Sequence, residues 1–354
     1  MSEVTIVGAG LSGMIAAINL ARNEHKVTIL ERESRIGGWP IFRPDPAGSW
    51  FDLEAMKRWT GVDISPAVKV IEQSYAYAYG KGYKIPGKAS IKLYMVERGS
   101  RSTSIDTMLV NEALSLGVEI EYDHPVISRG DFSKLPPNSI VATGLQIESY
   151  QALDVPYTPL YFWFAKGAVP HDRTTVSMWV DDFSTDYAFN CTMNGVCFAL
   201  LSQRDKPLKH DGKMKYTEML YETEGIELQG WNDLEGLACP AGSIRNPRLF
   251  QGKKVLAGTL AGVIDPFLFY GMLGALVSGR IAAMAIDDRG AAIKAFRKAT
   301  LTFYPSYAAK RAFNRVPDGI KKPVARLGLS MIPVFEELVM RLATTLTPGW
   351  RVAR

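Results

Sequence analysis

The feature that most constrains this chain is a glycine-rich segment near its N-terminus. Residues 4–13 read Val-Thr-Ile-Val-Gly-Ala-Gly-Leu-Ser-Gly, and after an apolar-faced run residues 26–32 read Lys-Val-Thr-Ile-Leu-Glu-Arg. This order predicts a strand, a tight turn, a helix, and a second strand ending in an acid. The N-terminus of such a helix attracts the pyrophosphate of a dinucleotide. We therefore predict a Rossmann-type domain that binds a dinucleotide; the alternative is a glycine-rich turn with a structural role only.

Each glycine of the motif has a separate predicted role. Gly8 permits the turn out of the strand, Gly10 lets backbone N–H groups approach the pyrophosphate, and Gly13 lets the helix pack closely on the strand. Glu31 stands at the end of the second strand, where its carboxylate can accept hydrogen bonds from ribose hydroxyls. The predicted contacts of this half of the dinucleotide are Gly8, Gly10, Leu11, Ser12, Gly13, Glu31 and Arg32.

Composition excludes several classes of protein. The chain has 354 residues, a formal net charge of +5 and three cysteines, Cys191, Cys197 and Cys239, which form no CxxC and no metal-ligand spacing. The charge is too slight and too scattered to favour nucleic acid, and the few free thiols are typical of a reducing compartment. We therefore expect a cytoplasmic location and no metal. Basic residues gather between 321 and 354, which favours a solvated helical surface over contact with an anionic membrane but leaves that contact open.

The rest of the chain predicts an α/β protein with an inserted antiparallel sheet. Residues 39–48, rich in Pro and Gly, are expected to be a loop, and residues 105–116 a helix. Residues 174–180, 187–193 and 196–201 read as strands, the last two joined by the hairpin turn Asn194-Gly195. We divide the chain into a discontinuous dinucleotide domain (1–64, 99–150 and 253–290), a β-rich substrate domain (65–98 and 151–252), and C-terminal helices (291–354).

Two further segments favour FAD as the dinucleotide. Gly37-Gly38 follows Glu31-Arg32 at a spacing common in flavoproteins, so Gly38 and Trp39 are predicted to contact the cofactor. In residues 255–283 a strand leads through small residues into a helix that begins near Gly271 and Met272. The N-terminus of that helix can stabilise negative charge on a reduced flavin ring. The alternative for this segment is a buried Gly/Ala helix packed on the sheet.

The late segment resembles a known family, the FAD-dependent geranylgeranyl reductases, within the para-hydroxybenzoate hydroxylase-like flavoproteins. The resemblance is carried by Gly258, Ala261-Gly262, Asp265-Pro266, Gly271 and residues 278–283. It implies FAD contacts at Arg101, Val126, Ala142, Gly144, Thr259 and Asp265. Thr259 stands where the family has Asp, Thr143-Gly144 replaces the Asp-Gly of the hydroxylases, and the Cys that often lies beside the Gly-Gly loop is absent.

Aromatic residues of the middle region predict an apolar substrate pocket. Its expected members are Tyr161, Trp163, Trp179, Phe189, Cys191, Phe267, Phe269 and Tyr270. A plain aromatic core is the alternative for the first four and for Phe164. Cys191 and Cys197 are expected to face the same side as packing residues. The four histidines lie apart, and no residue stands out as a general acid or base.

From these observations we predict an FAD-dependent oxidoreductase acting on an apolar or isoprenoid-like substrate. The resemblance makes reduction of a C=C bond, by hydride transfer through flavin N5, the leading reaction. Flavin-dependent hydroxylation is the second candidate, oxidation of an amine or C–C bond the third, and a non-catalytic flavin-binding interaction protein stays open. Because there is no second GxGxxG, NAD(P)H or another electron donor would bind only transiently.

Overall fold

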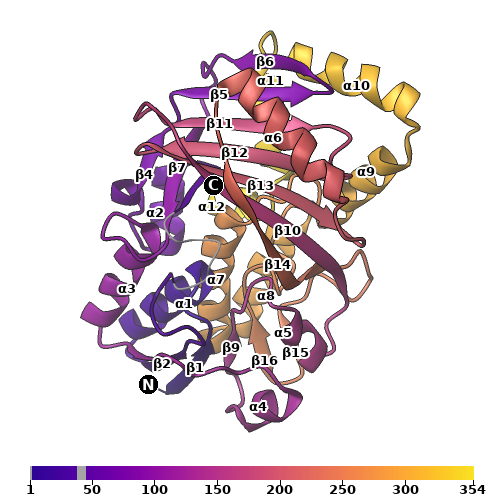
Figure 1. The fold of residues 1–354 in the computed structure, drawn as a ribbon. Coiled ribbons are helices and arrows are strands. Elements are labelled where there is room, and N and C mark those ends of the chain that lie inside the picture. Colours follow the sequence, from indigo (N-terminus) through magenta and orange to yellow (C-terminus); the bar gives the residue numbers. More distant parts are fainter. Residues whose placement is uncertain (1, 38–44) are drawn as a thin grey trace.

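The computed structural model describes residues 2–37 and 45–354, and its strands form sheets of six, seven and three strands. The two larger sheets make two layers, with the N-terminus in the six-stranded one (Figure 1). Helices fill the remaining space, and the C-terminal helices run from the six-stranded layer to the outer edge of the seven-stranded one. The predicted α/β class, with a Rossmann-type sheet, an inserted sheet and C-terminal helices, is confirmed.

The six-stranded sheet has the order β15-β16-β9-β1-β2-β8. It is parallel except at β15, and its strands are β1 (Glu3–Val7), β2 (Lys26–Leu30), β8 (Glu119–Glu121), β9 (Ile140–Val141), β15 (Phe250–Gln251) and β16 (Lys254–Leu256). Parallel strands buried on both faces read as apolar runs, which is why these segments could be recognised in the sequence. Helices α1 (Leu11–Arg22), α3 (Ile105–Ser115) and α7 (Met272–Asp287) belong to this layer.

Close helix packing in this layer depends on small residues. Gly279 of α7 lies against α1, where an added Cβ would stand 2.4 Å from the Ser12 carbonyl oxygen. Gly13 of α1 lies against the first turn, where a Cβ would stand 2.0 Å from the Gly8 carbonyl oxygen. Both contacts are far shorter than a van der Waals contact, so the two helices can reach their positions only with glycine there.

The seven-stranded sheet has the order β14-β10-β13-β12-β11-β5-β6 and is antiparallel except for the β11–β5 pair. Its strands are β5 (Gln73–Ala78), β6 (Lys81–Ile85), β10 (Tyr157–Ala168), β11 (Thr175–Val180), β12 (Tyr187–Met193), β13 (Val196–Arg204) and β14 (Gln229–Pro240). The Asn194-Gly195 turn joins β12 to β13, as its sequence predicts. One face of this sheet is covered by α6 (His210–Glu224), and the other faces the six-stranded layer (Figure 1).

The three-stranded sheet corrects one expectation. Its order is β3-β7-β4, from β3 (Asp45–Phe51), β7 (Lys92–Arg98) and β4 (Val68–Val70), so residues 45–48 are strand and not loop. Pro46 is tolerated because β3 is an edge strand, where a missing N–H breaks no ladder on its open side. The other residues of the predicted loop, 39–44, lie outside the described residues.

The remaining helices complete the molecule. They are α2 (Leu53–Thr60), the 3₁₀ turn at Ser65–Ala67, α4 (Arg129–Lys134), α5 (Ile147–Ala152), α8 (Arg289–Thr300), α9 (Phe303–Arg315), α10 (Asp318–Met331), α11 (Glu336–Leu346) and α12 (Trp350–Ala353). The C-terminal segment is thus helical, as expected from its sequence. Across the described ranges, no helix combines the length and the apolar character that crossing a bilayer requires. The predicted domain boundaries remain a prediction.

Candidate FAD and substrate site

The glycine-rich turn and the end of β2 form one hydrogen-bonded unit. Gly8 has φ +98°, and a Cβ there would stand 2.8 Å from the Ala142 carbonyl oxygen, so both its conformation and its surroundings require glycine. The Glu31 carboxylate accepts hydrogen bonds from the Ala9 N–H (2.7 Å) and the Glu33 N–H (2.9 Å). Glu31 therefore holds the glycine-rich turn against the end of β2 through these hydrogen bonds, and it also lines the cavity.

A second turn, at Gly258, lies against the first turn of α1. Gly258 has φ +66°, its N–H donates to Ser278 Oγ at 2.7 Å, and a Cβ there would stand 2.8 Å from Ser12 Oγ. The chain then reaches Gly271 at the N-terminus of α7, which no side chain of the described part of the chain caps. The first N–H groups of this 16-residue helix and the positive end of its dipole are thus available to an anionic group in the cavity.

One continuous cavity of about 380 Å³ joins these turns to the inner face of the seven-stranded sheet. It has two dissimilar ends, one polar and lined by the turns, the other apolar and lined by the sheet. Sixteen of the predicted site residues line it: Gly8, Gly10, Leu11, Ser12, Glu31, Arg32, Val126, Ala142, Gly144, Phe189, Cys191, Thr259, Phe269, Tyr270, Gly271 and Met272. Their individual roles stay predictions.

Sequence reasoning missed much of the apolar end. This chamber is formed by inward residues of β10–β13, namely Phe162, Val176, Met178, Phe198, Leu200 and Ser202. The signal was present in the alternation of the strands, because residues two apart share a face. Phe189 of β12 pairs with Leu200 of β13 and with Met178 of β11. Paired residues share a face of the sheet, so placing Phe189 inward predicts that Leu200 and Met178 also face inward.

The same alternation corrects two predicted pocket residues. Trp163 and Trp179 point away from the cavity to the face covered by α6, where Trp179 stacks on Tyr77 at 3.8 Å and Lys213 lies over the Trp163 ring. Cys197 lies on that outer face as well, opposite to Cys191, because the two-residue turn pairs Cys191 with Phe198. The expectation that both thiols face the same side is therefore wrong.

Other predicted residues also lie off the cavity lining. Arg101 is half-exposed and forms an ion pair with Glu97 at 3.1 Å. Arg98, which forms an ion pair with Asp106 at 2.9 Å, lines the cavity instead of Arg101. Phe267 packs on Phe313 behind the site. The remaining predicted residues off the lining are Gly13, which lies beneath the turn, Asp265 and Tyr161. Gly38 and Trp39 lie outside the described residues.

The unpartnered atoms of the cavity fit a polar dinucleotide. Thr143 Oγ1 and Glu148 Oε2 are buried and have no hydrogen-bond partner within the ranges that the structure describes, and both residues line the cavity. Buried polar atoms are rarely left in this state, so they indicate a ligand or water as partner. Among the described residues, no atom lies within 4 Å of where a Gly10 Cβ would stand, so these residues leave space above the turn for a pyrophosphate.

Two titratable groups border the apolar chamber. Cys191 is fully buried, and desolvation raises the pKa of its thiol to about 12. Burial likewise raises the pKa of Tyr270, whose ring packs on Trp50 with centroids 4.1 Å apart. Both groups are therefore protonated at neutral pH, when each has a proton to donate.

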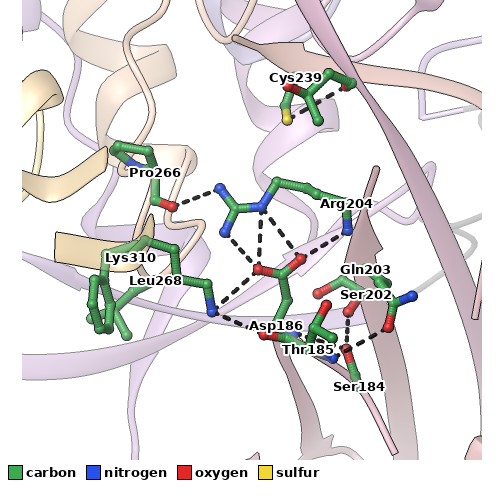
Figure 2. Close-up of polar contacts among 12 residues, drawn as sticks. Ser184, Thr185, Asp186, Ser202, Gln203, Arg204, Cys239, Pro266, Leu268 and Lys310 are labelled. Carbon is green, nitrogen blue, oxygen red and sulfur yellow. Dashed lines mark hydrogen bonds and ion pairs between the residues drawn. The ribbon is translucent and has the colours of Figure 1, made fainter. Parts of the chain in front are cut away.

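A buried charge cluster supports the loop between the second turn and α7 (Figure 2). Asp186 accepts from Arg204 and lies 3.2 Å from Lys310 Nζ, while Arg204 Nη1 donates to the Pro266 carbonyl oxygen at 2.7 Å. Burial alone would raise the pKa of Asp186, but the charges and hydrogen bonds of Arg204 and Lys310 hold it below its ordinary value. Arg204 also lies over the ring of Phe269, which has φ +60° and lines the cavity.

Comparisons with known proteins agree with this geometry. Residues 6–69 match the NAD(P)-binding Rossmann-like domain model. Among solved structures, a geranylgeranyl bacteriochlorophyll reductase-like protein from Thermoplasma acidophilum superposes with a TM-score of 0.71 over 97% of this chain and 99% of that one, at 13% identity. The p-nitrophenol 4-monooxygenase of Pseudomonas putida superposes with a TM-score of 0.64 over 98% and 99%, at 14% identity. The resemblance stated from the sequence is thus confirmed at the level of the fold.

Curated relatives match only part of the chain. L-amino-acid oxidases of Siganus canaliculatus and Mus musculus are 29% and 32% identical over 34% and 31% of this chain. These matches span 26% and 21% of the two relatives, so the chain matches about a quarter of their length. With the Rossmann match and the cavity, these flavoprotein similarities indicate FAD as the dinucleotide, as predicted.

Proposed function

We propose that this chain is an FAD-dependent oxidoreductase that reduces a C=C bond of an apolar, isoprenoid-like substrate. The observation that supports it most is the cavity, which runs without a break from a dinucleotide turn to an apolar chamber. A bound dinucleotide that follows the turns would end beside a space suited to a hydrocarbon chain. The fold shared with a geranylgeranyl bacteriochlorophyll reductase-like protein supports the same substrate class.

The residues present would hold FAD in a defined order. The Gly-rich turn and the N-terminus of α1 suit the pyrophosphate, Glu31 the ribose, and Thr259 the ribityl chain. The uncapped N-terminus of α7 would favour an anionic ring. When bound and reduced, FAD supplies the hydride.

Reduction of a C=C bond also needs a proton, and this chain offers one at Cys191. Its Sγ stays protonated at neutral pH and the residue lines the chamber, as does Tyr270. With an apolar substrate in the chamber, its apolar walls would exclude water, so a proton donated from the sheet side would reach the substrate carbon without competition from solvent. We assign Cys191 as the proton donor, with Tyr270 as the alternative.

A flavin-dependent hydroxylase is the second candidate. The whole-chain fold match to p-nitrophenol 4-monooxygenase favours it. The two functions differ in how fast the reduced flavin reacts with oxygen. In a hydroxylase this reaction must be rapid, and in a reductase it must be slow.

The test uses the FAD-loaded protein, reduced without oxygen and mixed with geranylgeraniol as the probe. We expect the flavin bands to return together with a product two hydrogens heavier, and to return only slowly with oxygen alone. Met178→Trp, which fills the chamber, should suppress the reaction while FAD stays bound; Met214→Trp, on exposed α6 surface, should leave it unchanged. Rapid reoxidation by oxygen with hydroxylation of p-nitrophenol, and no effect of geranylgeraniol, would overturn the reductase in favour of the hydroxylase.

A further inference from the structure

The C-terminal helices display an apolar surface that no other described part of the chain covers. On α10, Ile320, Val324, Leu327 and Met331 recur at helical spacing, and each is at least 40% exposed. None of the residues of α10 is buried. The stripe continues through Val334, the most exposed of the set at 72%, and along Leu338 and Leu342 of α11. We call the outer faces of residues 320–342 the apolar ridge.

The ridge is held in this orientation by polar contacts on its inner side. Lys322 pairs with Asp182 at 2.9 Å, and Arg326 donates to the carbonyl oxygen of Tyr79. On α11, Glu336 accepts from the backbone N–H groups of Lys88 and Ala89. Because these contacts hold the basic and acidic side chains inward, the apolar side chains face out.

This distribution is unlike that of an ordinary solvated helix. A surface helix of a globular protein turns its apolar side chains to the core and its polar side chains to water. Here the apolar stripe of α10 faces out over three turns and continues on α11. Exposed apolar patches of this extent mark interaction sites.

The residues around the apolar ridge carry an excess of positive charge, which favours an anionic partner. Residues 311–354 contain eight Lys or Arg and three Asp or Glu, and Arg315 and Arg341 are exposed beside the ridge. An apolar face of Leu, Ile and Val bordered by basic residues is the pattern of a helix that lies in the plane of an anionic membrane surface. Figure 1 shows α10 at the outer edge of the molecule, where a flat surface could reach it.

We propose that the apolar ridge docks onto an anionic lipid membrane. The helices lie on the surface and do not cross it, with the aliphatic side chains among the acyl chains and the basic residues at the phosphates. The proposal deepens the proposed function, since a membrane is the medium that stores isoprenoid-like molecules, but vesicle binding can be measured without any turnover.

The experiment is co-sedimentation of the FAD-loaded protein with vesicles of phosphatidylcholine, with or without phosphatidylglycerol. We expect binding to the anionic vesicles that weakens as salt rises, and little binding to phosphatidylcholine alone. Val324→Asn with Leu327→Asn should weaken binding at least about tenfold, because binding scales with the apolar area inserted. Ile244→Asn removes an even more exposed apolar side chain elsewhere and should change nothing.

Three results would overturn the proposal. One is a wild-type protein that stays in solution with both kinds of vesicle. Another is equal binding of the double variant and the wild type. The third is a wild-type dimer that the double variant converts to a monomer without any vesicle binding, which would assign the ridge to a second copy of the chain. In each case the flavin spectrum and turnover report separately on the proposed function.

Discussion

The two glycines at the start of α1 make a matched pair that separates cofactor binding from folding. Gly13→Ala and Gly10→Ala add the same methyl group three residues apart. At Gly13 the new Cβ would stand 2.0 Å from the Gly8 carbonyl oxygen, more than about 1 Å inside normal contact. At Gly10 it would meet no atom of residues 2–37 or 45–354 within 4 Å, and the backbone (φ −76°, ψ −179°) already suits alanine.

The magnitudes follow from these contacts. Gly13→Ala must push α1 away from β1; overpacking costs about 1–3 kcal/mol, and replacing a helical glycine returns up to about 1 kcal/mol. Because the clash is with backbone, we expect a net loss near the upper end, about 2 kcal/mol. Gly10→Ala should leave the free energy of unfolding of the apoprotein within about 0.5 kcal/mol, as surface substitutions do, yet weaken FAD binding by ~10-fold or more, since its methyl occupies pyrophosphate space.

The assays are urea unfolding of the two apoproteins and titration of FAD followed by flavin fluorescence. We expect the Gly10→Ala apoprotein to be as stable as wild type but to bind FAD poorly. A Gly10→Ala protein that binds FAD as well as wild type would refute the placement of the pyrophosphate. A Gly13→Ala apoprotein as stable as wild type would refute the close packing of α1 on the turn.

Three further predictions follow from the site. Glu31→Ala leaves the Ala9 N–H without its carboxylate partner, so FAD affinity should fall by ~10-fold in the same fluorescence titration; unchanged affinity would exclude a role for this carboxylate. Folding lowers the pKa of Asp186, so its ion pairs stabilise the protein fully above the ordinary carboxyl pKa, and this stabilisation is lost as the pH falls through the lowered pKa. Between pH 6 and pH 3, the free energy of unfolding in urea should therefore fall more steeply for wild type than for Asp186→Asn. Parallel curves for the two proteins would contradict this. Cys191→Ala should slow the proposed reduction at least ~10-fold with FAD still bound, whereas Cys197→Ala, on the outer face, should leave the rate unchanged; equal rates for both would shift the proton donor to Tyr270.

The sequence predicted best what local patterns encode. The Gly-rich turn and Asn194-Gly195 have one favoured geometry each, and apolar runs mark buried parallel strands, so β1, β2, β12 and β13 could be placed closely. The loop prediction was wrong for residues 45–48. It rested on the preference of Pro and Gly for loops, whereas the edge position that tolerates Pro46 depends on the tertiary structure.

The errors at the site have a different cause. Arg98 and Arg101 are three residues apart, and only the turn after β7, closed by Asp106, decides which of them reaches the cavity. The cluster of Asp186, Arg204 and Lys310 was not foreseen, because it joins the residue before β12 and the end of β13 to α9, more than 100 residues away in the sequence. In contrast, the opposite orientation of Cys191 and Cys197 follows from counting across the two-residue turn and could have been predicted.

One cavity joins the dinucleotide turns to the apolar chamber, so the redox end of a bound FAD would lie against that chamber. The most direct measurement is the absorption spectrum of the FAD-reconstituted protein through anaerobic photoreduction, with and without a long-chain hydrocarbon alcohol in the chamber. We expect flavin bands that bleach on reduction and that shift when the alcohol binds, with the shift lost in Met178→Trp. A protein that stays colourless after reconstitution does not bind FAD, and flavin bands that the alcohol leaves unchanged would show that the chamber does not adjoin the flavin.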